Sequence, residues 1–277
     1  MVLTYNILLW IIVFAFGLAF GSLANVCIWR IPREESIISP PSHCPGCNKP
    51  IEWYDNIPLL SFIILLGRCR HCQTKISWQY PLVEFITGIC FLLLFMRYHF
   101  TMFFFFDLIL VFYLILISGI DFHTQLIPDL LSLPLLGIGL LTSFINPNLF
   151  IVSTKLHVFL HVPIPLPIVQ IMSSILGVLT GGGLLYLIAW VSRGGMGGGD
   201  IKLAAAIGAF LGWENVLWSL GVAFLIGGLV ALILLISGLK KRKDPVPFGP
   251  FIALGAVIVL LFLPLLYNLL FYNLMAF

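Results

Sequence analysis

Charged residues are scarce in this sequence. Only 9% of its 277 residues are Asp, Glu, Lys or Arg, whereas about a quarter of a typical soluble domain is charged. Hydrophobic residues make up 61% of the chain, and the mean hydropathy is +1.12. The shortage of charge excludes a soluble globular protein and indicates a polytopic membrane protein. The net charge of +3 is small, so we expect no nucleic-acid partner.

Patterns typical of other enzyme classes are also absent. No Gly-x-Ser-x-Gly turn offers a serine nucleophile, and no Gly-Lys-Ser/Thr follows the glycine run at 194–199. A serine hydrolase and a nucleotide-binding loop are therefore both disfavoured. The N-terminal apolar run, 5–29, has no basic segment before it and is longer than the core of a cleaved signal peptide. We interpret it as a first membrane span.

Long apolar runs predict the fold class: an all-α polytopic membrane protein with about eight transmembrane helices. A helix needs about 20 residues to cross the hydrocarbon core, so the second run is short and the sixth is too short to cross alone. The predicted spans are 5–29, 81–97, 101–120, 128–146, 167–192, 201–213, 215–237 and 249–271.

The distribution of basic residues predicts the orientation. If the loop 30–80 is cytoplasmic, only Arg97 and Lys155 of the 14 Lys and Arg residues fall outside. Because basic residues concentrate in cytoplasmic loops, we expect the N-terminus outside the cell. The residues then placed inside are Arg30, Arg33, Lys49, Arg68, Arg70, Lys75, Arg193, Lys202, Lys240, Lys241, Arg242 and Lys243.

The loop 30–80 carries two Cys-x-x-Cys pairs, in Cys44-Pro45-Gly46-Cys47 and Cys69-Arg70-His71-Cys72. Four thiolates at this spacing are typical of a closed, structural zinc site, and a reducing cytoplasm disfavours the alternative of disulfides or redox pairs. His43 and His71 are possible competing ligands, although four cysteines already complete the shell. A loop of this size has too little core to fold unaided, so we expect the metal to hold it together.

Two aspartates stand where long apolar runs meet short polar breaks. They are Asp121, in Gly119-Ile120-Asp121-Phe122-His123, and Asp200, which follows the glycine run. Desolvating a carboxylate at a membrane boundary is costly, so acids kept there are candidate functional residues. The predicted orientation puts both on the cytoplasmic face. Two carboxyls held close can share one proton and activate water against a peptide bond. The alternative is that Asp200 only caps the N-terminus of a helix, although one residue can be both a cap and a catalytic acid.

Residues around the two aspartates have predicted supporting roles. Gly197 and Gly199 allow a flexible helix entry that admits an extended peptide. Asp129 follows Pro128 in a first helical turn, so we interpret it as a structural acid. Lys202 either pairs with a carboxylate or marks the inner boundary. Asp107 is expected near the outer side, without a catalytic part.

Two readings from other functional classes remain open at this point. An ion-coupled transporter or channel would use the two aspartates to bind a cation, and it predicts acids near the bilayer midplane in repeated halves. A docking platform with an inert membrane anchor would give a role to the cysteines alone. The second reading leaves the glycine-flanked aspartates unexplained.

Taken together, the motifs resemble the bacterial type IV prepilin peptidases over nearly the whole chain. The resemblance implies an aspartic endopeptidase that removes the leader of prepilins or pseudopilins at the cytoplasmic face of the inner membrane. It also implies methylation of the new N-terminus with S-adenosylmethionine, and a place beside pilus or type II secretion machinery. It maps the catalytic pair onto Asp121 and Asp200. The matching segments are 21–32, the four cysteines, Asp121 with 127–129, 197–202 and 248–251.

The resemblance also suggests candidate cofactor residues and a domain division. Asn25 and Arg30 match the family's first-span pattern, and Glu84 is an acid near the membrane that can hold an ammonium group of substrate or cofactor. The alternative, which we weigh equally, is that Glu84 lies at the membrane interface or pairs with a neighbouring basic residue. The predicted division is a first span at 1–29, a methylation-associated zinc domain at 30–80 and a peptidase domain at 81–277.

Overall fold

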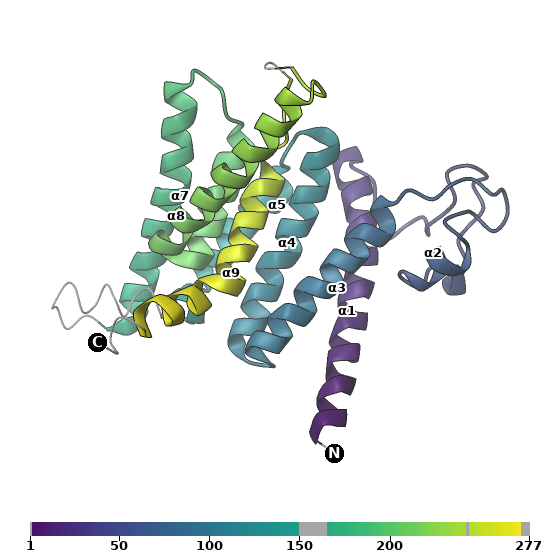
Figure 1. The fold of residues 1–277 in the computed structure, drawn as a ribbon, viewed down its shortest axis with the longest axis horizontal. Coiled ribbons are helices and arrows are strands. Elements are labelled where there is room, and N and C mark those ends of the chain that lie inside the picture. The colour runs from purple at the N-terminus through teal and green to yellow at the C-terminus, as the bar shows by residue number, and fades with distance from the viewer. Residues whose placement is uncertain (1, 150–164, 242–243, 273–277) are drawn as a thin grey trace. The chain divides into compact units, whose positions relative to one another are not determined.

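The computed structural model describes residues 2–149, 165–241 and 244–272, and the regular structure of these ranges is helical (Figure 1). Residues 1–100 and 101–277 pack as two separate units, which we call unit 1 and unit 2. The all-α membrane fold expected from the sequence is confirmed. Lys155, Arg242 and Lys243, which the orientation argument uses, lie outside the described residues.

Unit 1 is built on two apolar helices, α1 (Val2–Arg30) and α3 (Gln79–Tyr98), which pack along each other. Glycine permits the close approach, because a Cβ at Gly21 would lie 2.5 Å from Glu84 Cα. The insertion between these helices holds three short helices: η1 (Ile31–Arg33), η2 (Trp53–Asp55) and α2 (Leu60–Ile64). Helix α3 thus packs in unit 1, whereas the predicted division by function, which assigns it to the peptidase domain, stays a prediction.

Unit 2 is a bundle around α8. Its described helices are α4 (Met102–Thr124), α5 (Asp129–Leu141), α7 (Leu166–Val191), α8 (Gly198–Ile236) and α9 (Gly249–Tyr272). Helix α8 packs against α5, α7 and α9, and α4 packs against α9. Residues 203–212 of α8 are all buried, as expected for a helix that is apolar on every side. The first half of α8 is therefore the core of this unit.

Helix α8 is interrupted at Gly212, whose φ of 79° and ψ of 173° are not helical. The break leaves the preceding carbonyls without their helical donors. Asn146 Nδ2 donates to the Phe210 carbonyl at 3.0 Å, and Ser174 Oγ donates to the Ala209 carbonyl at 2.9 Å. Both of these side chains are fully buried. The predicted sixth and seventh spans therefore correspond to the two helical segments that meet at Gly212.

The helix lengths bear on the predicted number of spans. Among the described residues, five helices are long and apolar enough to cross a membrane: α1, α3, α4, α7 and α8. Helix α5 and the segment Gly249–Phe262 of α9 are shorter, so the count of eight spans stays a prediction. Two boundaries differ from prediction, since α4 continues to Thr124 and α8 begins at Gly198. Asp121 and Asp200 consequently lie inside the last and first helical turns, where backbone donors are close by.

Candidate active site and metal centre

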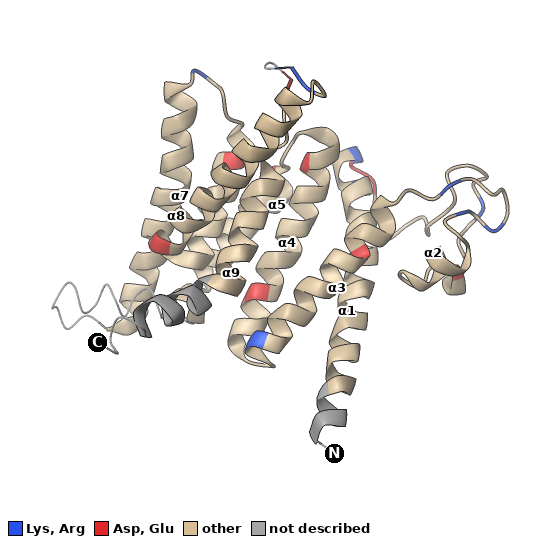
Figure 2. Cartoon of the chain, in the orientation of Figure 1, with Lys and Arg blue, Asp and Glu red and all other residues tan. Residues whose placement is uncertain are grey.

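Three connections of unit 2 gather at one end of its bundle: those between α4 and α5, between α7 and α8, and between α8 and α9 (Figure 1). Figure 2 shows basic residues in the last two of these connections. Gln125 Nε2, after α4, donates to the Pro245 carbonyl, before α9, at 3.5 Å. Both candidate catalytic aspartates belong to helix turns beside these connections.

Asp121 is held by the start of α9. Its carboxylate is 4% exposed, and Oδ2 accepts a hydrogen bond from the Gly249 N–H at 2.9 Å. That amide is one of the first N–H groups of a helix, which have no partner within the helix and favour a negative charge. A Cβ at Gly249 would lie only 2.8 Å from Asp121 Oδ2. The contact therefore requires glycine at this position.

Asp200 is held by the start of its own helix. It is the third residue of α8, whose N-cap is Gly197, so the simple N-cap reading is wrong. The Asp200 carboxylate nevertheless lies close to Gly197, since a Cβ there would be 3.1 Å from Asp200 Oδ2, as for an acid in the first turn that reaches back to the N-cap. Asp200 is half-buried, and its carboxyl interacts electrostatically with that of Asp121. The two acids therefore share one neighbourhood.

Ile127 joins the two helix starts that hold the aspartates. A Cβ at Gly199 would lie 2.7 Å from Ile127 Cβ, and one at Gly249 would lie 3.3 Å from Ile127 Cδ1. The beginnings of α8 and α9 thus both lie against Ile127, which belongs to the segment that follows Asp121. Two carboxyls brought together in this way repel when both are ionised, which favours a single shared proton. Acid and base catalysis by one pair of carboxyls would need such a shared proton.

Asp129 and Lys202 form a separate ion pair. Lys202 Nζ lies 2.6 Å from Asp129 Oδ1 and 2.7 Å from Oδ2, and both side chains are exposed. The pair joins the first turn of α5 to the first turn of α8. Of the two predicted possibilities for Lys202, pairing with a carboxylate is confirmed, and the carboxylate is Asp129.

The four cysteines of the insertion form one cluster, with their Sγ atoms all within 4.8 Å of one another. Cys44 Sγ and Cys72 Sγ are 3.6 Å apart, close to the spacing of about 3.8 Å that follows from tetrahedral Zn–S bonds of about 2.3 Å. All six cysteines of the chain are free thiols, in agreement with the expected absence of disulfides. The donor set and its spacing fit a zinc ion.

The two halves of this cluster repeat one backbone pattern. The Cys44 N–H donates to the Lys49 carbonyl at 3.0 Å, and the Cys69 N–H donates to the Thr74 carbonyl at 2.9 Å. Each pair thus sits on a tight turn. The Thr74 hydroxyl, 3.1 Å from Cys72 Sγ, lowers the pKa of this thiol to about 6. The thiolate is the form that binds a metal, so this turn prepares Cys72 as a ligand.

The three candidate cofactor residues all lie in unit 1 but differ in their hydrogen-bond partners. Glu84 is buried, and its Oε2 accepts a hydrogen bond from the Leu59 N–H at 2.8 Å, so it is not ion-paired with a described residue. Asn25, 3% exposed, donates to the Tyr80 carbonyl, and its Oδ1 has no hydrogen-bond partner among the described residues. Arg30 is occupied differently, because its guanidinium donates to the carbonyls of Ser36 and Pro40.

Comparison with known proteins gives a consistent result. Residues 108–236 match the type IV leader peptidase family, and residues 15–98 match the bacterial peptidase A24 N-terminal domain. The chain belongs to the type IV leader peptidase family. A prepilin leader peptidase/N-methyltransferase of Aeromonas hydrophila is 33% identical, over 90% of this chain and 89% of its own length. Enzymes of that name from Legionella pneumophila and Bacillus subtilis (strain 168) are 32% identical, over 94% and 91% of this chain and 93% of their own lengths. No solved structure matches.

Two further residues of this candidate site lie within the matched motifs, although the sequence predicts no role for them. Gly249 and Ile127 are the residues whose contacts hold Asp121 beside the start of α8. The available signal was their position, since Gly249 precedes a proline at a helix start and Ile127 stands between the two acids Asp121 and Asp129. Their proximity to Asp121 in space, however, cannot be read from their positions in the sequence.

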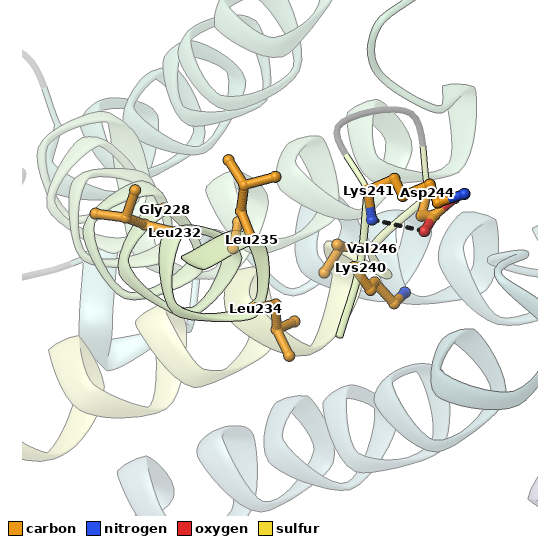
Figure 3. Close-up of a pocket in the computed structure, with 9 residues that line it drawn as sticks. Gly228, Leu232, Leu234, Leu235, Lys240, Lys241, Asp244 and Val246 are labelled. Carbon is orange, nitrogen blue, oxygen red and sulfur yellow. Dashed lines mark hydrogen bonds between the residues drawn. The ribbon is translucent and has the colours of Figure 1, made fainter. Parts of the chain in front are cut away.

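A cavity of about 320 Å³ lies elsewhere in unit 2, at the end of α8 (Figure 3). None of the candidate catalytic residues lines it, so we assign it no part in the leader-peptidase site. It is lined by Gly228, Ala231, Leu232, Leu234, Leu235, Lys240, Lys241, Asp244 and Val246.

Proposed function

We propose that this chain is a membrane-embedded aspartic endopeptidase that removes the leader from type IV prepilins or pseudopilins and then methylates the new N-terminal residue. The family and the printed names of its relatives support both activities. The observation that carries the proposal is the proximity of Asp121 and Asp200 at one end of unit 2, each beside the start of a helix.

The chemistry needs only this pair and water. One carboxylate takes a proton from a water molecule, whose oxygen attacks the scissile carbonyl carbon. The other, protonated carboxyl donates to the substrate, and the amide nitrogen leaves as an amine after it gains a proton. No covalent intermediate forms, and the pair returns to its single shared proton. The Gly249 amide and the contact with Gly197 keep both acids in place while the charge moves between them.

The proposed site of action is the cytoplasmic face of the bacterial inner membrane, with the N-terminus outside. The basic residues of the connections beside the aspartates support this orientation. The apolar part of a prepilin would dock among the helices and leave its leader in the cytoplasm. The aspartates lie in helix-end turns rather than midway along helices, which disfavours the alternative of a cation transporter.

The proposed methyl donor is S-adenosylmethionine, which supplies an electrophilic methyl group. The unpartnered Oδ1 of Asn25 and the buried carboxylate of Glu84 fit a ligand that carries hydrogen-bond donors and an ammonium group. Asn25 bonds the first turn of α3 at Tyr80, and Glu84, in the second turn of α3, bonds the insertion at Leu59. Arg30 fits less well as a direct ligand and is better assigned to holding the loop 36–40. Zinc at the four cysteines would hold the insertion that completes this region.

Co-expression with a prepilin tests the peptidase assignment. We expect Asp121→Asn and Asp200→Asn each to abolish leader removal, measured as the mass of the substrate. Asp129→Asn is the matched control, because it removes a nearby charge that only pairs with Lys202. Full processing by either of the first two variants, or loss of processing in the control alone, would overturn the assignment.

A further inference from the structure

Helix α2 in the zinc insertion turns its apolar side chains outward. Leu60, Ile63 and Ile64 are exposed, Ile64 to 64%, and Leu66 just after the helix is 85% exposed. Ser61, in contrast, is buried, and its Oγ donates to the Tyr54 carbonyl at 3.0 Å. A segment in contact with water would show the opposite pattern. We call the four exposed residues the α2 face.

The insertion holds α2 beside a membrane span rather than beyond its end. The Leu59 N–H, directly before α2, donates to the Glu84 carboxylate at 2.8 Å. Glu84 lies about 8 Å along α3 from Gln79 at a rise of 1.5 Å per residue. Figure 1 likewise shows α2 level with the first turns of α3. The start of α2 therefore lies at a depth that is already inside the span.

Trp78 marks the membrane boundary at the same place. It immediately precedes α3, a span of 20 residues, and is 76% exposed. Its ring contacts that of Phe62 in α2, with centroids 4.9 Å apart. Exposed tryptophan at the end of a span is typical of the interface between headgroups and acyl chains. Helix α2 is thus tied to that interface through Phe62 and through Leu59.

Two basic residues come after the α2 face in the sequence. Arg68 and Lys75 are both exposed and lie opposite each other in an antiparallel β-bridge. Cations beside an exposed apolar segment match the anionic headgroups of the cytoplasmic leaflet. The α2 face lies at interfacial depth, beside an exposed tryptophan and two cations. These three features together favour the lipid bilayer as the partner that covers the α2 face.

We propose that the α2 face inserts into the headgroup and acyl boundary of the leaflet in which α3 begins, so that the insertion rests on the membrane. The insertion is then a membrane-docked element rather than a domain free in the cytoplasm. Its four leucine and isoleucine side chains contact acyl chains, while the zinc knuckles stay on the aqueous side. The proposal does not depend on the peptidase or methyltransferase assignment.

Photocrosslinking of the full chain in nanodiscs tests the proposal. A benzoylphenylalanine at Ile64 or Leu66 should give adducts with the mass of one phospholipid after irradiation. The same group at Lys49, an exposed position in the first cysteine knuckle, is the control and should give none above background. Absence of lipid adducts at 64 and 66, equal yields at 49, or crosslinks to another segment or a second copy of the chain would overturn the proposal.

A second measurement uses the native protein and so does not depend on variants that fold. Nanodiscs containing a phospholipid with a photoactivatable acyl chain would be irradiated and the chain digested. We expect lipid-modified peptides that include residues 60–66, and none from residues 42–50. Modification of the second segment but not the first would reject the proposed surface.

Discussion

The four-cysteine insertion of unit 1 and the aspartate end of unit 2 hold their key groups by opposite means. The insertion has only short helices, η1, η2 and α2, and gathers four side chains that a metal can join. The aspartate end uses a backbone amide and close glycine contacts, against a helix whose residues 203–212 are all buried. The first arrangement depends on a ligand and the second on packing. The two should therefore fail independently.

The sharpest way to test this independence is to remove a metal ligand. We expect Cys69→Ser to unfold the insertion, because metal binding of about 10–16 kcal/mol is typically the folding energy of such small sites. Limited proteolysis should cut residues 31–78 rapidly, and zinc content measured by mass spectrometry should fall to background. Leader removal should persist in the same preparation. Cys90→Ser, which changes a cysteine outside the cluster, should leave both readouts at native levels.

A methyl group added at the aspartate end should impair leader removal and leave the insertion intact. Gly249→Ala puts a Cβ 2.8 Å from Asp121 Oδ2, so the carboxylate or the start of α9 must shift. A displacement of about 1 Å at reacting groups can lower the rate about a hundredfold, and we expect a loss of that order in leader removal. Zinc content should be unchanged. Gly198→Ala is the control, since its Cβ would meet nothing within 4 Å, and comparable losses in both variants would contradict the explanation.

The break in α8 offers a test of smaller size. Asn146→Ala leaves the Phe210 carbonyl buried without a donor, which typically costs about 1–3 kcal/mol. We expect a lower melting temperature for unit 2 in detergent, followed by a fluorescence scan. Thr180→Ala removes a hydroxyl that bonds only within its own helix and should shift the melting temperature less. Equal shifts would argue against the special role of the broken helix.

The exposed pair between Lys202 and Asp129 should matter least. Both side chains are solvent-exposed, so the pair is worth at most about 1 kcal/mol and weakens with salt. Lys202→Gln should retain leader removal within a few-fold of native, and the double variant with Asp129→Asn should be no worse. A complete loss of processing in Lys202→Gln would mean that Lys202 acts in the chemistry.

Much of this architecture is predictable because its signals are local. Four cysteines at zinc spacing and apolar runs of spanning length depend on neighbours in the sequence, and both predictions are confirmed as a cluster and as an all-α membrane fold. The roles of Asp121 and Asp200 stay predictions, although the structure brings the two residues together. The partner of Lys202 and the contact of Gly249 with Asp121 join positions far apart in the chain. Residue types alone do not encode such pairings.

The interruption at Gly212 has a consequence for how firmly Asp200 is placed. About 12 residues, or about 18 Å of helix, separate the break from Asp200, and the residues from Leu203 to Gly212 are all buried. Asn146 and Ser174 bond the carbonyls just before the break. The helical segment that carries the acid is thus anchored at its far end by two uncharged side chains, without any charge of its own in the membrane.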